Sequence, residues 1–92
     1  MNQEELEAEN LAIAREAIVK AAKKTKITDM GAMIRQETVR MERHIMPFIA
    51  RWRKQHPDAD RDQLLLNASE EIKDYAFNGW RLNSTLDPRL PY

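Results

Sequence analysis

Apolar residues recur at intervals of three or four along nearly the whole chain, the spacing of one face of an α-helix. The apolar–polar alternation typical of strands is absent, and only two glycines, Gly31 and Gly79, interrupt the pattern. A chain of 92 residues has room for one hydrophobic core. The sequence therefore predicts a single all-α domain over residues 1–92, a small bundle of three to four helices with an extended C-terminal tail.

Local signals place the first three helices. The first is expected from about residue 3 to residue 26, and its alanine-rich apolar face predicts that segment 1–28 is partly frayed or packed against a partner. Asp29 is expected to cap a second helix over 30–45. Pro47 lacks an amide hydrogen, so it should end that helix and open a third over 47–55. One apolar face continues through both, formed by Met30, Met33, Ile34, Thr38, Met41, Ile45, Phe48, Ile49 and Trp52.

The last third of the chain predicts a loop, a long helix and a tail. Residues 56–60 form the loop, and Asp60 with Gln63 resembles a capping box at the start of a helix. That helix should run to about Arg81 and then give way to the extended tail, residues 83–92. Its apolar face is expected to hold Leu65, Ala68, Ile72, Tyr75, Ala76 and Gly79, widened by Leu64, Leu66, Phe77 and Trp80.

Composition and charge exclude several classes of function and of functional site. Fifteen basic and fifteen acidic residues balance, so the chain as a whole does not attract nucleic acid or anionic lipid. The absence of cysteine excludes disulfides, thiolate catalysis and cysteine-ligated zinc. The start of the sequence is acidic rather than signal-like, and its uninterrupted apolar runs are far too short to cross a membrane. We therefore expect a cytoplasmic protein without a membrane segment.

The residue types that carry chemistry lack the spacing that catalysis or metal binding needs. His44 and His56 are separated by a proline and do not form a helical ligand pair. Three alternating aspartates begin like a calcium loop, but Gln63 and Ser69 stand where that loop needs glycine and glutamate. We expect a protein that is not an enzyme and that uses no cofactor and no metal ion.

The middle of the chain is basic and supports an alternative function. Phosphate contacts could come from Arg40, Arg43, Arg51, Arg53 and Lys54, with Trp52 as a stacking ring. The zero net charge and the acidic stretch that follows argue against it. Nucleic-acid binding therefore remains the alternative hypothesis for the function of this segment.

The two tryptophans favour binding to another protein. Large aromatic side chains are enriched at protein interfaces, and a domain this small needs few of them in its core. One of Trp52 and Trp80 could complete the core while the other anchors a partner. Self-association through the first helix is a further possibility.

Two local patterns resemble a known family. The first pattern consists of Glu42-Arg43, then Met46-Pro47 after a gap of two residues, and then Ile49-Ala50 after a gap of one residue. The second pattern consists of Arg81-Leu82, then Ser84 after a gap of one residue, and then Arg89-Leu90-Pro91-Tyr92 at the end of the sequence. With Gln55-His56-Pro57 between them, they resemble the theta subunit of bacterial DNA polymerase III and its phage and plasmid relatives, over roughly residues 36–92. The stretch between Pro57 and Arg81 is longer than in that family, and the first helix does not match it in detail.

The resemblance implies a three-helix, non-enzymatic accessory that binds and stabilises the proofreading exonuclease of a DNA replication complex. It draws attention to Met46, Pro47, Ile49, Ala50, Arg81 and Leu82. The sequence itself adds three aromatic residues, Phe48, Trp52 and Trp80. We expect the partner-binding residues to be Met46, Pro47, Phe48, Ile49, Trp52, Trp80, Arg81 and Leu82. The alternative is a small phage or regulatory protein that binds nucleic acid or modulates a host DNA-processing enzyme.

Overall fold

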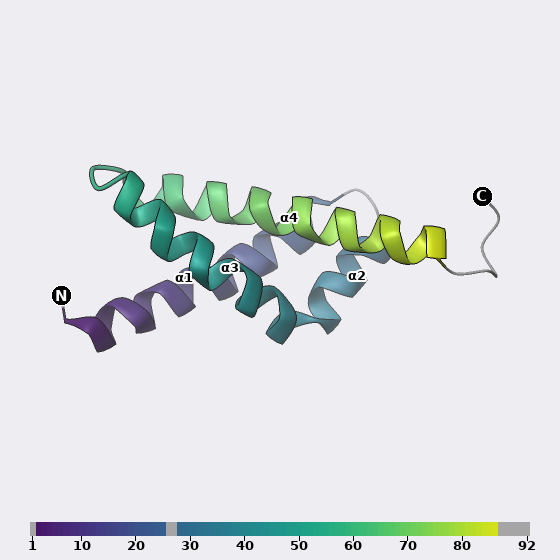
Figure 1. Cartoon of the computed structure of the whole chain (residues 1–92), viewed down its shortest axis with the longest axis horizontal. Coiled ribbons are helices and arrows are strands. Elements are labelled where there is room, and N and C mark those ends of the chain that lie inside the picture. The colour runs from purple at the N-terminus through teal and green to yellow at the C-terminus, as the bar shows by residue number, and fades with distance from the viewer. Residues whose placement is uncertain (1, 26–27, 87–92) are drawn as a thin grey trace.

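The computed structural model describes the backbone of residues 2–25 and 28–86, and the side chains of residues 2–25 and 29–79. This part of the chain folds into four helices and contains no strand (Figure 1). They are α1 (Gln3–Lys24), α2 (Thr28–Gln36), α3 (Thr38–Gln55) and α4 (Arg61–Leu86). The predicted all-α small bundle is confirmed.

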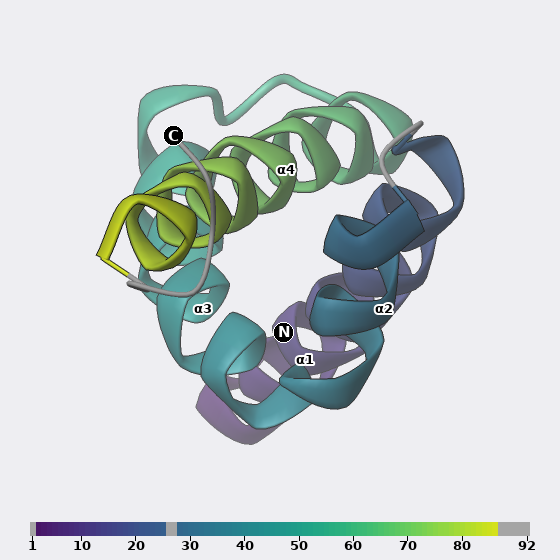
Figure 2. The same ribbon diagram turned by 90° about the vertical axis from the view of Figure 1, so that its right-hand side faces the viewer.

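The four helices surround a common centre, as the view along the long axis shows (Figure 2). Helices α3 and α4 run in opposite directions and are joined by the loop of residues 56–60, as expected. Helix α1 packs against all three other helices, most extensively against α4. The first turns of α1 lie at the same end of the molecule as the α3–α4 loop (Figure 1).

One face of each helix supplies the core. Helix α1 contributes mainly alanines, whose small side chains let α3 and α4 approach its backbone closely. Gly31 has a similar role, because an added Cβ would lie 3.2 Å from the carbonyl oxygen of Ala22. The buried apolar side chains are Ile13, Ala14, Ala17, Ile18, Ala21, Ala22, Met30, Ile34, Met41, Ile45, Ile49, Leu64, Leu65, Ala68, Ile72 and Ala76.

The predicted break at Pro47 is wrong, because α3 continues through this residue. Pro47 lies on the exposed side of α3, as does Arg43, whose carbonyl loses its helical partner. Water can satisfy a carbonyl group on that side, so the missing hydrogen bond does not have to end the helix.

The break lies at Glu37 instead, where the backbone leaves helical geometry with φ −107° and ψ 40°. The hydroxyl of Thr38 donates a 2.9 Å hydrogen bond to the carbonyl of Arg35, which supports the end of α2. The second and third helices are therefore α2 and α3 with these bounds, and not 30–45 and 47–55. Asp29 lies inside the first turn of α2 and is not its cap.

The C-terminal prediction was wrong for residues 83–86, which form the last turn of α4 and not an extended tail. The nearest proline is Pro88, and a proline restricts only the residue before it, so nothing local stops the helix at Arg81. Residues 87–92 of the predicted tail lie outside the described part of the chain.

Two apolar residues assigned to the buried face of α4 are not buried. Leu66 is 45% exposed and Phe77 is 42% exposed, whereas Leu64 is buried as expected. Leu66 and Phe77 lie on the side of α4 opposite Ala68, Ile72 and the other core residues. The predicted widening of the face is therefore confirmed for Leu64 and wrong for Leu66 and Phe77, and the side chain of Trp80 lies outside the described residues.

The capping box at the start of α4 is confirmed. Asp60 Oδ1 accepts a 2.8 Å hydrogen bond from the backbone amide of Gln63, and Gln63 Oε1 accepts one of 3.3 Å from the amide of Asp60. Both amides precede or begin the helix and would otherwise lack intrahelical partners. The box fixes the point at which the chain turns back from α3.

Candidate functional site

A cavity of about 440 Å³ lies at the end of the bundle where α1 begins, α3 ends and α4 begins. Its walls mix apolar, aromatic and charged groups drawn from all three helices and the loop. The lining residues are Leu6, Glu9, Trp52, Arg53, His56, Pro57, Ala59, Asp60, Arg61 and Leu64.

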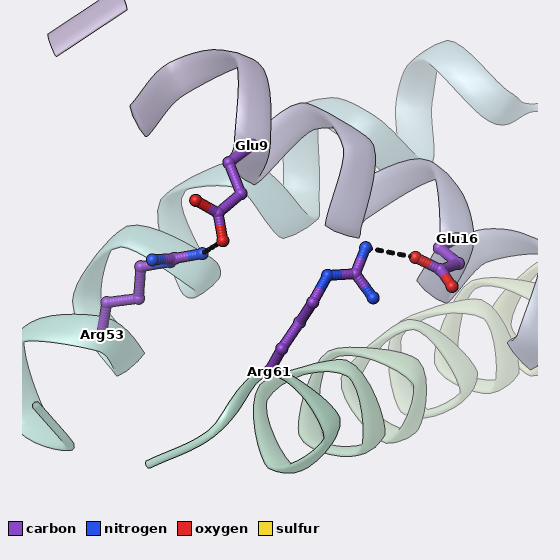
Figure 3. A network of polar contacts seen from close by, with 4 residues as sticks. All are labelled: Glu9, Glu16, Arg53 and Arg61. Atoms are coloured by element: carbon purple, nitrogen blue, oxygen red, sulfur yellow. Dashed lines mark hydrogen bonds and ion pairs between the residues drawn. The ribbon is translucent and has the colours of Figure 1, made fainter. Parts of the chain in front are cut away.

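Two ion pairs hold this end together (Figure 3). Arg53 Nη2 lies 2.9 Å from Glu9 Oε1 and connects α3 to α1. The guanidinium of Arg61 bonds the carboxylate of Glu16 and connects α4 to α1. Arg61 lowers the pKa of Glu16 below its ordinary value of 4.5, chiefly through this hydrogen bond. Glu16 in turn raises the pKa of Arg61.

Trp52 forms part of the cavity wall and is neither fully buried nor fully exposed. Its indole stacks on the imidazole of His56, with ring centroids 4.3 Å apart. His56 Nδ1 also lies 3.1 Å from the carbonyl oxygen of Trp52. The stack therefore closes the last turn of α3, and both of its residues line the cavity.

A second hollow of about 320 Å³ lies between α1 and α3, and we call it the α1–α3 groove. Leu6 and Arg53 line both this groove and the cavity, so the two adjoin. The lining residues are Gln3, Leu6, Glu7, Asn10, Met46, Ala50, Arg53 and Lys54.

Asn10 is the unusual residue of the groove. It is only 5% exposed, yet its Oδ1 has no hydrogen-bond partner among the described residues. Buried polar atoms in folded proteins are nearly always paired, and leaving one unpaired costs about 1–3 kcal/mol. Arg53 Nε, at the shared edge of the two hollows, is buried and unpaired in the same sense.

Histidine 44 belongs to a separate cluster between α3 and α4. Its Nε2 lies 3.0 Å from Glu71 Oε1, and its ring stacks on Tyr75 with centroids 3.8 Å apart. The hydroxyl of Tyr75 accepts a 3.1 Å hydrogen bond from Arg40 Nε, and Glu37 pairs with the same guanidinium. The hydrogen bond to Tyr75 and then Glu37 raise the pKa of Arg40. These contacts join α3 to α4.

The predicted partner-binding residues whose side chains the structure describes do not form one surface. Met46 lines the groove and Trp52 lines the cavity. Pro47 is exposed on the outer side of α3, and Phe48 packs partly against the core. Ile49 is fully buried, so the prediction that it contacts a partner does not agree with its position. Helix α4 includes the backbone of Trp80, Arg81 and Leu82, but the side chains of these three residues are outside the described part of the chain.

The predicted basic residues divide into two groups. Arg40, Arg43, Arg51 and Lys54 are exposed. Arg53 is turned toward α1, where Glu9 neutralises it. Because Arg53 is engaged in this structural ion pair, it is not free to contact phosphate as the sequence predicted.

Sequence reasoning missed the α1 side of the site, namely Leu6, Glu9, Asn10 and Glu16, together with Arg61. One signal was present: Asn10 interrupts an otherwise apolar row on α1. The charged partners carried no comparable signal, because Glu9–Arg53 and Glu16–Arg61 join residues that are 44 and 45 positions apart.

Within the described ranges, no three acidic or histidine side chains are grouped so that they could hold a metal ion. None of the helices described is both long and apolar enough to cross a membrane. No protein-family profile, no curated protein sequence and no solved structure matches this chain.

Proposed function

We propose that this protein is a non-catalytic accessory that binds a partner protein at the α1–α3 groove. The observation that carries the proposal is the unpaired amide oxygen of Asn10 in a hollow whose accessible wall is mostly apolar. Apolar pockets with one or a few polar groups are typical of binding sites, because burial gives affinity and the polar group fixes orientation. Leu6, Met46 and Ala50 supply the apolar part here.

Asn10 can serve either a donor or an acceptor on the partner. Rotating its amide by half a turn exchanges the oxygen and the nitrogen, which occupy nearly equal volumes. A partner group that reaches the amide would satisfy an atom that is unpaired in the isolated chain. Part of the energy of burying Asn10 is then recovered only in the complex.

The rims of the groove carry opposite charges. Glu7 lies on the α1 side, where Gln3 donates a 3.0 Å hydrogen bond to it, and Lys54 lies on the α3 side. Charges arranged in this way orient a partner more than they tighten its binding.

The partner we propose is the proofreading exonuclease of a bacterial DNA replication complex. The support is the resemblance to theta subunits, which includes the segment Met46-Pro47 and Ile49-Ala50. Met46 and Ala50 of that segment both line the groove. A replication subunit acts in the cytoplasm, and a chain without cysteine suits that reducing compartment.

The test is a calorimetric titration of the purified chain with the exonuclease subunit of bacterial DNA polymerase III. Two exposed alanines provide a matched pair of variants: Ala50 lines the groove, and Ala12 lies on α1 outside the residues that line it. Ala50→Glu places a charge in the groove and should weaken binding at least tenfold. Ala12→Glu adds the same charge to an exposed helical position and should leave the Kd within about twofold.

Helical circular dichroism should be equal for both variants and the wild type, because both substitutions lie on exposed helical positions. If the wild-type chain does not bind the exonuclease, the proposed partner is wrong. Equal binding by the two variants would mean that the groove is not the docking surface.

A further inference from the structure

Four basic side chains lie on the solvent side of α3, which we call the basic face: Arg40, Arg43, Arg51 and Lys54. The buried residues Met41, Ile45 and Ile49 occupy the opposite side of the same helix. Because α3 is not broken at Pro47, all four charges are held on one rigid element. From Arg40 to Lys54 the face is roughly 21 Å long at the rise of an α-helix.

The charges of the basic face are largely unneutralised. Arg43, Arg51 and Lys54 form no ion pair with any of the side chains that the structure describes, residues 2–25 and 29–79. Arg40 is held in place by Tyr75 and Glu37 and stays 47% exposed.

No acidic residue of α3 lies on this face. Glu42 is the one acid of the helix, and it pairs with Arg15 of α1 at 3.0 Å. A chain with zero net charge therefore presents one locally positive surface, and local potential governs contact with a charged partner.

We infer that the basic face binds the phosphate backbone of nucleic acid. Its length matches about six steps of B-form DNA at roughly 3.4 Å per step along a strand. Arginine guanidinium groups suit phosphate because their parallel donors contact two oxygens at once. Pro47 and Ala50, which lie between the charges, are small and let a strand approach the helix.

Other polyanions fit the face less well. A helix that binds a lipid surface inserts its apolar side, and the apolar side of α3 is buried in the core. No aromatic side chain is exposed on the basic face, so we expect contact with phosphates and not stacking with bases. Binding should therefore depend little on sequence.

The test is the anisotropy of a labelled DNA duplex, and of one of its strands alone, titrated with the protein between about 50 and 200 mM salt. Four phosphate contacts predict a slope of log K against log salt of about −3.6 for the duplex and about −2.8 for the single strand. Whichever of the two binds more tightly, the duplex or the single strand, is the form of DNA that the basic face prefers.

The variant Arg43→Gln/Arg51→Gln leaves the groove residue Lys54 in place, so it separates this inference from the proposed function. We expect affinity for DNA to fall about tenfold or more and the duplex slope to shrink to about −1.8. The control Lys23→Gln/Lys24→Gln removes the same charge from exposed positions at the end of α1 and should change affinity less than threefold.

Three results would overturn the inference. They are no binding at the lowest salt, equal weakening by both double variants, and displacement of DNA by polyglutamate or phosphatidylserine vesicles as readily as by unlabelled DNA. Binding of the exonuclease by the Arg43→Gln/Arg51→Gln variant should match wild type, so the two proposals fail separately.

Discussion

At the scale of single residues, Asn10 links stability and binding. Its amide is buried within the largely apolar face of α1 and has an unpaired Oδ1 in the described structure. Replacing such a group by an apolar one of similar size removes an uncompensated cost.

Asn10→Leu should therefore raise the free energy of unfolding by about 1–2 kcal/mol, measured by urea denaturation. The same variant should bind the exonuclease more weakly, since the partner loses its hydrogen bond in the groove. Asn67→Leu, at an exposed position of α4, is the control and should leave partner binding unchanged. A less stable Asn10→Leu variant with unchanged affinity would contradict this role.

Glu16 should make stability depend on acid pH. Arg61 holds the folded-state pKa of Glu16 below 4.5, so the carboxylate stabilises the folded protein at pH values above 4.5. That contribution is lost as the pH falls below 4.5 and through the lowered folded-state pKa.

We expect urea midpoints measured from neutral pH to below pH 4.5 to fall more for wild type than for Glu16→Gln. Arg61→Gln removes the cause of the shift and should abolish the same difference. Because this pair is exposed, the effect should also shrink as salt is added. Parallel curves for wild type and Glu16→Gln would show that the pair does not stabilise the fold.

At the scale of secondary-structure elements, local rules predicted what depends on local chemistry. The capping box of Asp60 and Gln63, the loop of residues 56–60 and the buried rows of α1 and α3 follow from neighbouring residues alone. The exposed side of α4 could not be predicted from neighbouring residues, because Leu66 and Phe77 are apolar and only packing decides which flank of α4 another helix covers.

The position of the break between α2 and α3 also depends on packing. Met30 and Ile34 of α2 are buried, and so are Met41, Ile45 and Ile49 of α3, although the two helices are separated at Glu37. No strong helix breaker marks Glu37, whereas Pro47 does break the hydrogen-bond pattern and is nevertheless tolerated. The groove was beyond sequence reasoning for a similar reason, since Asn10 and Met46 meet only in the folded chain.

Pro47→Ala should stabilise the protein, because it restores a backbone donor on an exposed side of a continuous helix. We expect a gain of about 1–3 kcal/mol in the free energy of unfolding, measured with urea. Pro57→Ala is the matched control: it lies in the loop, where no helical hydrogen bond is missing, and should cost less than about 1 kcal/mol. A destabilised Pro47→Ala variant would mean that the proline is needed for the curvature of α3.

At the scale of the whole molecule, the bundle is elongated, with extents of 51 × 21 × 20 Å. Its radius of gyration is 14.6 Å, against roughly 12 Å for a compact domain of this length. The cavity and the groove both involve the first turns of α1, where residues 3–5, 7 and 8 are exposed and Leu6 supplies the apolar contact. This end of the molecule should therefore open more readily than the centre.

A partner that docks there should stabilise the folded state. At a free concentration of about 100 times its Kd, a ligand specific for the folded chain adds roughly 2.7 kcal/mol to the free energy of unfolding. The thermal midpoint of the chain should therefore rise as exonuclease is added, and Ala50→Glu should abolish most of the rise. An equal rise for Ala50→Glu would point to docking elsewhere.

Amide hydrogen exchange of the chain, with and without the exonuclease subunit, tests the central claim most directly. We predict that binding slows exchange chiefly in residues 3–10 and 46–54, the two sides of the α1–α3 groove, while the exposed side of α4 around Leu66 and Phe77 is unchanged. Protection confined to α4, or none in either groove segment under saturating exonuclease, would contradict the account.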